Sequence, residues 1–345
     1  MAGLIQFLEE SRTYPKVFWK SRGSKDAFAG YGMGKNSGVT FGGMSFSPQV
    51  CSGVWSSFPS SLFFSPEVIR QEPWEPSHLP FNAPTIIKRQ DTPDFNTYWM
   101  LIEDVLKKME KEGLKKVVPA RQTTLTYDQK INPFELLRML NPWGAEASIF
   151  FIQLDPQTCF LGATPEKLFH RQKNKLKTEA LAGTKDRCET WTAKESSEVE
   201  AVQIFLQQQL LKLCSSVQWN PPGQRPFGNL KHLYQSVEGD LKDEITDHDL
   251  ISYLHPTPAL GGFPVKQALD YLAENEPIQR GWYGAPFGMI SPIETDIAVA
   301  IRSALILGDE LHLFSAAGIV PGSHPHQEWN ELDRKIAHYL RYNKE

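Results

Sequence analysis

The sequence predicts an α+β fold in which large, mostly antiparallel β-sheets pack together with flanking helices. Strand-like stretches follow one another with only tight turns between them at 148–184 and again at 281–320. Helical patterns lie between these stretches at irregular intervals, which favours antiparallel sheets over a regular alternation of strands and helices. We find no internal repeat and no linker, so residues 1–345 are predicted to form one domain, with a looser part over 1–95 and a core over 96–345.

Composition and charge exclude several classes of protein. The chain has 345 residues, of which 41% are hydrophobic and 22% charged, as is ordinary for a globular chain with a large core. The net charge of -4 provides no broad positive field, so neither nucleic acid nor an anionic membrane is expected as a partner. No run approaches about 18 apolar residues, and the amino terminus lacks the basic segment of a signal peptide. The four cysteines form no CxxC pair, which favours a reducing cytoplasm and argues against a zinc site.

The first half of the chain is predicted to be mainly strands. Up to about residue 90, short alternating pieces such as "VTFGGMSFS" indicate strands joined by turns. Apolar residues at helical spacing predict a helix over 95–112, with Gly113 as its C-cap. The stretch 114–127, "LKKVVPARQTTLTY", is expected to be a strand, and 148–184 to contain three strands joined by turns.

The second half adds the longer helices. A long helix is predicted over 192–213, with Thr192 as its N-cap. A short helix is expected to end in a turn within 247–262, "DHDLISYLHPTPALGG". The remaining predicted elements are a helix over 264–276, strands over 281–290, 296–307 and 311–320, and a last helix over 326–342.

Two of these helices begin with the same acidic pattern. Glu195 and Glu198 lie three residues apart near one helix start, and Glu328 and Glu331 do so near the other, so each pair shares a face. The helix dipole favours acidic residues in a first turn, so each pair has a purely structural explanation when taken singly. If the two faces met, their carboxylates could bind a hard divalent ion such as Mg²⁺.

Two basic residues are candidates for binding an anion. In "AVAIRSALI", Arg302 interrupts a nearly continuous apolar strand, which is costly unless the guanidinium is paired. A substrate carboxylate would be a suitable partner, and so would an internal Asp or Glu. Lys335 lies one helical turn beyond Glu331 on the same face, beside the proposed metal, although a solvated helix lysine explains it as well.

Lys116 and Glu166 are candidates for proton transfer. In "KKVVPAR", Lys116 shares a strand face with Val118, and an inward-directed lysine has its pKa lowered from about 10.4 by desolvation, as a general base requires. The neighbouring Pro119 favours the alternative of an exposed edge strand. Glu166, in the "GATPEKL" turn, is either a proton donor with a raised pKa or an ordinary loop glutamate.

Nine motifs, in this order, resemble those of the chorismate-utilising enzymes, the family of isochorismate, salicylate, anthranilate and aminodeoxychorismate synthases. They are "KVVPAR", "GATPEKL", "TEALAGT", "KESSE", "LHPTPALGGFP", "RGWYGAPFG", "AIRSA", "AAGIVPGS" and "EWNELDRK". The similarity runs from about residue 100 to the end, and the earlier residues contribute chiefly "FGGMSF". The resemblance implies the chorismate-utilising enzyme fold.

The resemblance also implies roles for the candidate residues. Lys116 matches the general base that activates water for attack at C2 of chorismate, and Glu166 matches the acid that protonates the departing C4 hydroxyl. His232, which its apolar surroundings in sequence would make a core histidine, matches a histidine beside the substrate. The other residues implied to lie around the substrate are Leu181, Gly183, Thr184, Ala259, Tyr283, Arg302, Gly318 and Lys335.

A magnesium ion is implied by the same resemblance. Glu198 and Glu331 match the family's Mg²⁺-binding glutamates, with Glu195 and Glu328 as partners around the ion. One position departs from the pattern, because Ala316 stands where several relatives have glycine. Its methyl group is tolerable there only if the backbone angle φ is negative.

Within the family, three positions favour isochorismate synthase, an isomerase. Ala182 stands where many aminodeoxychorismate synthases have a lysine nucleophile, and Ala259 stands where pyruvate-eliminating members typically have threonine. Leu181, in "EALAGT", lies where it would line the water side. The alternatives are a salicylate synthase, an anthranilate synthase component and a non-catalytic chorismate-binding protein. No glutaminase subunit is expected, and the product could supply menaquinone, siderophore or salicylate synthesis.

Overall fold

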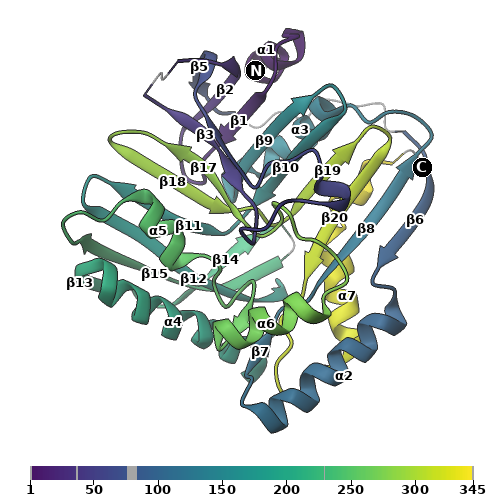
Figure 1. The fold of residues 1–345 in the computed structure, drawn as a ribbon, viewed down its shortest axis with the longest axis vertical. Helices are drawn as coiled ribbons and strands as arrows, with labels where there is room; N and C mark the ends of the chain where they lie inside the picture. Colours follow the sequence, from purple (N-terminus) through teal and green to yellow (C-terminus); the bar gives the residue numbers. More distant parts are fainter. Residues whose placement is uncertain (1, 36–37, 76–83, 229, 344–345) are drawn as a thin grey trace.

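Two large antiparallel β-sheets form the framework of the chain (Figure 1). The computed structural model describes residues 2–35, 38–75, 84–228 and 230–343, so part of the predicted looser segment 1–95 lies outside it. Among the described residues the first sheet has nine strands, in the order β5 (Pro66–Pro73), β2 (Asp26–Met33), β1 (Lys16–Lys20), β9 (Ser148–Asp155), β10 (Thr158–Thr164), β19 (Ser303–Leu307), β20 (Glu310–Ala316), β8 (Ala120–Tyr127) and β6 (Ile86–Thr92).

The second sheet packs against the first. In the part of the chain that the structure describes, its strands are β13 (Cys214–Trp219), β15 (Leu230–Leu241), β12 (Lys175–Asp186), β11 (Lys167–Gln172), β18 (Glu294–Val299), β17 (Pro286–Ile290), β3 (Thr40–Met44) and β4 (Ser61–Phe64), with β14 (Gly223–Phe227) paired to β15. A short ladder joins β16 (Gly262–Phe263) to β7 (Lys116–Val117). Aromatic side chains of both sheets, such as Trp19 and Phe287, pack together between them. The predicted α+β fold with antiparallel sheets is confirmed.

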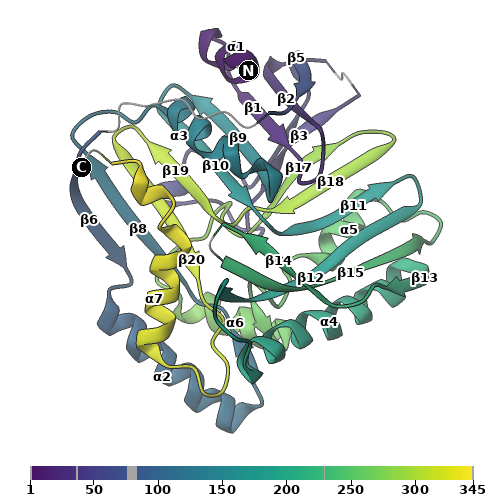
Figure 2. The ribbon, with the colours of Figure 1, turned by 180° about the vertical axis from the view of Figure 1, so that it is seen from behind.

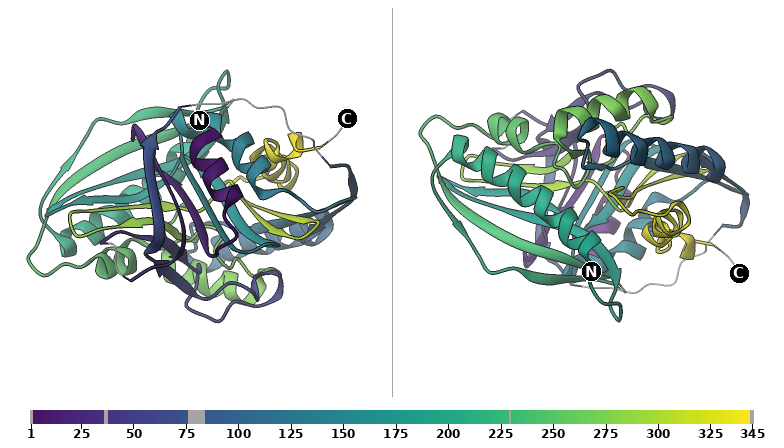
Figure 3. Two further views of the ribbon diagram at one scale, coloured as in Figure 1. Left: turned by 90° about the horizontal axis from the view of Figure 1, so that it is seen from above. Right: turned by 90° about the horizontal axis from the view of Figure 1, so that it is seen from below.

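Seven helices of the described residues flank these sheets, together with short 3₁₀ segments at Gly53–Trp55, Asn141–Ala145 and Tyr339–Arg341. They are α1 (Ala2–Glu10), α2 (Phe95–Glu112), α3 (Pro133–Leu140), α4 (Ala193–Leu213), α5 (Asp247–Leu254), α6 (Val265–Asn275) and α7 (Pro325–Ile336). Helix α4 lies along β12 and β15, and α7 packs on β20 and against α2 (Figure 2). Seen from below, α2, α4, α6 and α7 lie in front of the sheets (Figure 3). No described helix is both long enough and apolar enough to cross a membrane.

Local sequence signals predicted five of the seven helices of the described residues. Helix α2 has the predicted bounds and ends at Gly113, which takes the left-handed conformation with φ 74°. Helix α4 begins after Thr192, whose predicted N-cap is reinforced by a capping box with Glu195. The last helix is shorter than predicted. Helix α7 ends at Ile336, and a single 3₁₀ turn follows at Tyr339–Arg341. Helices α1 and α3 were not predicted.

Five strand predictions were wrong in their extent. The stretch 148–184 contains four strands rather than three, because its predicted middle strand is divided between β10 in the first sheet and β11 in the second. The predicted strand 311–320 ends with β20 at Ala316. The predicted strand 296–307 is two strands, because the chain leaves the second sheet after β18 and enters the first at β19. Arg302 lies in this break, with φ 52°, and is therefore not a mid-strand residue. The stretch 114–127 is divided between β7 and β8 at Val118–Pro119, and the first residues of 281–290 form a turn before β17. These breaks depend on long-range pairing, which a local pattern does not report.

Candidate active site

The predicted catalytic and substrate-binding residues line one small cavity of about 80 Å³. Some lie on the regular elements β7, β12, β15, α4 and α7. The others lie on the segments that join β10 to β11 and β18 to β19, on the loop after α5, on the turn before β17 and on the segment after β20. The predicted residues in its wall are Lys116, Glu166, Leu181, Gly183, Thr184, Glu198, His232, Ala259, Tyr283, Arg302, Gly318 and Lys335. The other three predicted glutamates, Glu195, Glu328 and Glu331, lie outside the wall.

Glu166 and Arg302 each lie at a point where the chain crosses from one sheet to the other. The chain passes from the first sheet to the second between β10 and β11, at Pro165 and Glu166, and returns between β18 and β19. The two crossings are paired through the backbone, because Val299 N donates to Glu166 O at 3.1 Å and Ala163 N donates to Arg302 O at 3.3 Å. Each crossing therefore holds one ionisable side chain at the junction of the sheets.

The loop "LHPTPALGGFP" is joined to the strand that carries Lys116. Val118 N donates to Gly261 O at 3.1 Å, and Lys115 N donates to Phe263 O at 2.9 Å. Gly262 has φ 127°, and a Cβ atom there would lie 2.2 Å from Lys116 O, so only glycine permits this approach. The loop is therefore a wall of the cavity rather than a free surface loop, and it places Ala259 beside the cavity.

Lys116 is buried, with 2% of its surface exposed, so the alternative of an exposed edge lysine is wrong. Its Nζ lies 3.6 Å from Oε2 of Glu198. Burial and the nearby Lys335 ammonium lower the pKa of Lys116, while Glu198 and Glu166 act in the opposite direction. A larger fraction of this amine is therefore neutral at a given pH than for a solvated lysine.

The pKa of Glu166 is shifted in the opposite direction, upward. Its backbone N–H donates to Oγ1 of Thr164 at 3.2 Å, and the residue is 7% exposed. Burial, followed by the negative charge of Glu179, raises the pKa of Glu166 to about 8. This carboxyl therefore carries a proton at neutral pH, and the cavity holds a potential base and a potential acid together.

Arg302 and Lys335 form a cationic end of the cavity. Nη1 of Arg302 donates to Lys335 O at 3.1 Å, and no carboxylate of the described residues forms an ion pair with this guanidinium. Burial lowers the pKa of Arg302 to about 10, so it remains charged at neutral pH. Nζ of Lys335 donates to Ala316 O at 2.8 Å and to Oε1 of Glu331 at 2.6 Å. A buried guanidinium without a carboxylate partner is suited to an anionic ligand.

His232 is held as a neutral hydrogen-bond acceptor. Its Nδ1 lies 3.2 Å from Gly183 O, which can only accept, so Nδ1 carries the proton. Burial and the charges of Arg302 and Lys335 lower the pKa of His232 to about 3. Its Nε2 is buried and has no hydrogen-bond partner among the described residues. His232 therefore lines the cavity with a ring nitrogen, Nε2, that can accept a hydrogen bond.

The two acidic helix starts meet. Nζ of Lys194, on α4, lies 2.6 Å from Oε1 of Glu328, on α7, and the charge of Glu331 acts on both Glu198 and Glu328. Burial raises the pKa of Glu198 and of Glu328, while the nearby charges of Lys116 and Lys194 act in the opposite direction. Glu195 is turned away from this group.

Glu195 has a structural role at the start of α4. Its Oε2 accepts hydrogen bonds from N and Oγ1 of Thr192 at 2.8 and 2.7 Å, which completes the capping box of the helix. Its Oε1 lies 3.4 Å from Nζ of Lys185. Both carboxylate oxygens of Glu195 are therefore engaged away from the other glutamates.

The remaining glutamates fit a hard divalent ion in their chemistry. Glu198, Glu328 and Glu331 offer carboxylate oxygens, which are the ligands preferred by Mg²⁺, and Oε2 of Glu328 is buried with no hydrogen-bond partner among the described residues. Within the described ranges, no three acidic, histidine or cysteine side chains converge as a complete metal site. Lysine side chains supply the counter-charge instead, from Lys116, Lys194 and Lys335.

The small residues of the "AAG" turn, Ala316 to Gly318, leave room for the charged side chains of Lys116 and Glu198. A Cβ atom on Gly318 would lie 2.8 Å from Oε2 of Glu198 and 2.9 Å from Cε of Lys116, so a side chain there would displace both. Ala316, the position that departs from the family pattern, is not among the described residues with positive φ. Its methyl group is therefore accommodated, and its carbonyl accepts a hydrogen bond from Lys335.

A family model described as "Chorismate binding enzyme" matches residues 70–342. The chain belongs to the chorismate binding enzyme family. Among curated relatives, the isochorismate synthase of Catharanthus roseus is 32% identical over 276 residues, which cover 75% of this chain and 48% of that protein. The isochorismate synthase MenF of Haemophilus influenzae is 32% identical over 248 residues, which cover 68% of this chain and 58% of that protein.

The chain spans about half the length of the curated relatives it matches. Its fold is that of the menaquinone-specific isochorismate synthase MenF of Escherichia coli, with a TM-score of 0.87 over 98% of this chain and 90% of that one. The sequences of these two chains are 24% identical, so this likeness concerns the fold.

The sequence did not identify Arg280 and Glu276, a pair of residues that supports the site. Arg280 donates to Leu260 O at 2.7 Å and to Val118 O at 2.6 Å, so it ties the "TPALGG" loop to the segment after Lys116. Nε of Arg280 also donates to Oε2 of Glu276 at 2.7 Å. Arg280 opens the "RGWYGAPFG" motif, but only the folded chain shows which carbonyls it binds.

Proposed function

We propose that this chorismate binding enzyme is an isochorismate synthase, an isomerase that converts chorismate to isochorismate. The observation that carries the proposal is the presence, in one buried cavity, of a lysine whose pKa is lowered and a glutamic acid whose pKa is raised. These are the two opposite perturbations that base and acid catalysis at neutral pH require. The names of the relatives, which are isochorismate synthases, support the same reaction.

In the proposed reaction, Lys116 accepts a proton from a water molecule as its oxygen forms a bond to C2 of chorismate. Both ring double bonds shift, from C1=C2 to C1=C6 and from C5=C6 to C4=C5, as the C4–O bond breaks, and Glu166 donates its proton so that the C4 hydroxyl leaves as water. One water enters and one leaves, so the product is an isomer of the substrate. Lys116 ends protonated and Glu166 ionised, and a proton passes from one to the other through solvent before the next turnover.

Substrate binding is assigned to the other residues of the cavity wall. Arg302 and Lys335 provide positive charge for the substrate carboxylates, and Tyr283, stacked on Phe314 at 5.4 Å, provides a rigid side. Nε2 of His232 is free to accept a hydrogen bond from a substrate hydroxyl. The described hydroxyl and backbone groups at Gly183, Thr184 and Gly318 complete this surface.

We propose magnesium as the cofactor and Glu198, Glu328 and Glu331, each of which pairs with a lysine in the ligand-free chain, as the carboxylates that would hold it. A bound Mg²⁺ would supply positive charge to orient and neutralise a carboxylate of chorismate. Isothermal titration with MgCl₂ tests this assignment without turnover: Glu328→Gln is expected to weaken binding at least tenfold, and the matched Glu195→Gln to leave it within about twofold. Equal losses in both variants, or none in either, would remove Glu328 from the metal site.

The cavity disfavours the nearest alternative, a salicylate synthase. Ala259 lies in the wall without a hydroxyl, where pyruvate-eliminating relatives are expected to have threonine. Ala182, also in the wall, provides no amine nucleophile. We therefore propose that the reaction stops at isochorismate, uses water rather than ammonia, and needs no glutaminase subunit.

Proton NMR of chorismate incubated with the purified protein and Mg²⁺, with and without ammonium, tests the proposed function. A final mixture of chorismate and isochorismate without pyruvate is expected. Salicylate with pyruvate would contradict the interpretation of Ala259 but keep the roles of Lys116 and Glu166. Binding of chorismate without formation of any product would indicate a non-catalytic chorismate-binding protein.

A further inference from the structure

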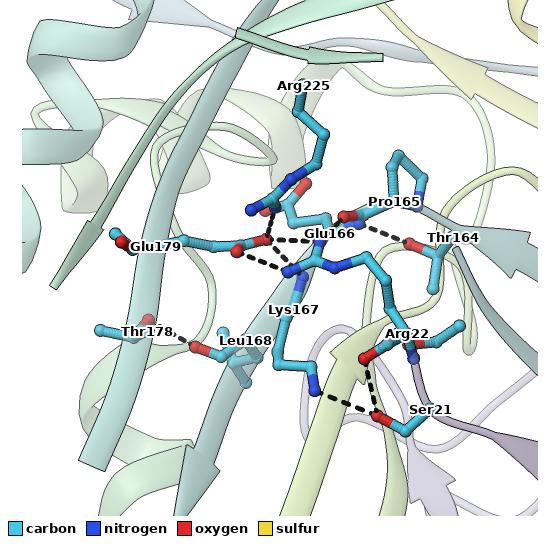
Figure 4. Close-up of polar contacts among 12 residues, drawn as sticks. Ser21, Arg22, Thr164, Pro165, Glu166, Lys167, Leu168, Thr178, Glu179 and Arg225 are labelled. Atoms are coloured by element: carbon cyan, nitrogen blue, oxygen red, sulfur yellow. Dashed lines mark hydrogen bonds and ion pairs between the residues drawn. The ribbon is translucent and has the colours of Figure 1, made fainter. Parts of the chain in front are cut away.

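A second charged cluster lies directly behind Glu166 (Figure 4). Its centre is Glu179, on β12, which is 8% exposed and opposite the start of β11. Oε1 and Oε2 of Glu179 accept from Nη1 and Nη2 of Arg22 at 2.9 and 2.6 Å, and Arg225 lies 2.6 Å from Oε1. Although burial opposes ionisation, the two guanidinium groups lower the pKa of Glu179 to about 2. Glu179 is therefore charged at any pH at which the protein would work.

This cluster holds the turn that carries Glu166. Oε1 of Glu179 accepts a hydrogen bond from the backbone N–H of Lys167 at 3.1 Å, and Nη1 of Arg22 donates to the carbonyl of Pro165. The residues on both sides of Glu166 are thus fixed by one ion pair (Figure 4). Among the described residues, no hydrogen bond joins the Glu166 carboxyl itself to the cluster, so that group remains available to the cavity.

The cluster lies between two cavities. Glu166 borders the small cavity described above, whereas Arg22 and Glu179 border a larger one of about 610 Å³ on the other side of the turn. The charges that act on Glu166 are Glu179 and Arg22 from this cluster, and Lys116 and Lys335 from the cavity. After burial, Glu179 makes the largest contribution, and it is the one charge of these four that favours the protonated carboxyl.

We propose that Glu179 is a positioning residue for the reaction: with Arg22 it fixes the backbone on both sides of Glu166 and places a permanent negative charge behind that carboxyl. This inference rests on the proposed function, in which Glu166 donates a proton. It assigns two separable effects to one side chain. The hydrogen bonds set where the acid lies, and the charge sets how strongly the acid keeps its proton.

The chain offers a matched control for a purely structural ion pair. Arg171, further along β11, lies 2.7 Å from Asp247 on α5, and both side chains are largely buried. Neither residue borders the small cavity or contacts the turn at Glu166. Asp247→Asn removes a partly buried carboxylate charge that pairs with an arginine of β11, so it measures the general effect of losing such an ion pair.

Two substitutions are expected to move the pH dependence in opposite directions. Glu179→Gln keeps an acceptor for Lys167 N but removes the negative charge, so the basic limb of the kcat profile should shift to lower pH. A shift of about one unit lowers kcat about fivefold at pH 8 and little at pH 6. Arg22→Gln removes a positive charge and should shift the basic limb to higher pH. Asp247→Asn should leave the profile unshifted.

Glu179→Asp separates position from charge. The shorter side chain keeps the charge but reaches Lys167 N less well, so kcat is expected to fall several-fold at every pH with KM nearly unchanged. Shifts of Glu179→Gln and Arg22→Gln in the same direction, or unshifted profiles in both, would overturn the proposal. So would a loss in Asp247→Asn that equals the loss in Glu179→Gln at every pH.

A titration without substrate distinguishes this proposal from the proposed function. The carboxyl resonance of Glu166 is followed by ¹³C NMR in glutamate-labelled, ligand-free protein and assigned by its absence in Glu166→Gln. Its midpoint is expected to fall in Glu179→Gln and to rise in Arg22→Gln, whether or not the protein forms isochorismate. If Glu179→Gln does not fold, the Arg22→Gln titration alone decides, because an unchanged or lowered midpoint there would overturn the role of the cluster.

Discussion

The two points at which the chain crosses between the sheets carry opposite chemistry. At the first crossing Glu166 is a buried acid whose surroundings make the neutral form stable, and its neighbours Pro165 and Lys167 are fixed by Arg22 and Glu179. At the second crossing Arg302 is a buried cation whose hydrogen bond goes to a carbonyl group. The first crossing is electrostatically satisfied without a ligand, whereas the second is satisfied only when an anion is present.

This difference separates two requirements of the proposed reaction. A proton donor must hold its proton until the leaving group needs it, so its environment has to be complete before substrate binds. A binding cation gains most if the ligand is its first full counter-charge. Substitutions at the two crossings should therefore affect different kinetic constants.

The largest effect is expected from removing the proton at the first crossing. Glu166→Gln replaces a protonated carboxyl by an amide of the same shape, so kcat should fall by about a thousandfold while the thermal midpoint at pH 6 stays nearly unchanged. Turnover by NMR and thermal unfolding by circular dichroism measure the two quantities. A variant that retained more than about a tenth of wild-type kcat would exclude Glu166 as the general acid.

The next largest effect is expected at the second crossing. Arg302→Met removes the cation and should raise KM for chorismate about a hundredfold, with a smaller change in kcat. Because no described carboxylate pairs with Arg302, the protein itself should lose little stability and could gain some. Initial rates over a range of chorismate concentrations, together with thermal unfolding, test this. A strongly destabilised variant would show that the guanidinium is needed for folding rather than for the ligand.

The pH dependence of stability should also differ between the crossings. The pKa of Glu166 is raised to about 8 in the folded state, above its unfolded value of about 4.3, so its stabilising contribution is present below the unfolded value and lost as the pH rises through 8. Wild type should therefore lose stability relative to Glu166→Gln between about pH 4.3 and pH 8. Urea unfolding of both proteins at several pH values measures this difference. Parallel curves would mean that Glu166 is ionised at neutral pH.

The sequence predicted those features that depend on neighbouring residues. The helix over 95–112, its cap at Gly113 and the cap at Thr192 follow from spacing and local hydrogen bonding, and all three are present. The motif resemblance named residues that the structure gathers in one cavity. These patterns could not predict the break in 296–307, because apolar residues lie on both sides of Arg302 and the change of sheet is set by pairing with distant strands.

The same limit applies to charge partners. Acidic residues at two helix starts looked equivalent in sequence, yet Glu195 closes a capping box while Glu328 contacts the other helix through Lys194. Arg22 and Glu179 are 157 residues apart, and no local pattern links them to the turn at Glu166. A single sequence reports the kinds of residues available for a site, whereas their partners depend on the packed sheets.

The smallest expected effects come from one hydrogen bond at each crossing. Thr164→Val removes the acceptor of Glu166 N, and Tyr339→Phe removes the hydroxyl that donates to Arg302 O at 2.9 Å. Each should cost about 1 kcal/mol of stability, because a buried backbone group loses one hydrogen bond. Since the first bond orients the acid and the second orients the cation, Thr164→Val should lower kcat a few-fold and Tyr339→Phe should raise KM a few-fold. If both variants changed the same constant, the two crossings would act as one unit, and the division between proton donation and anion binding would not hold.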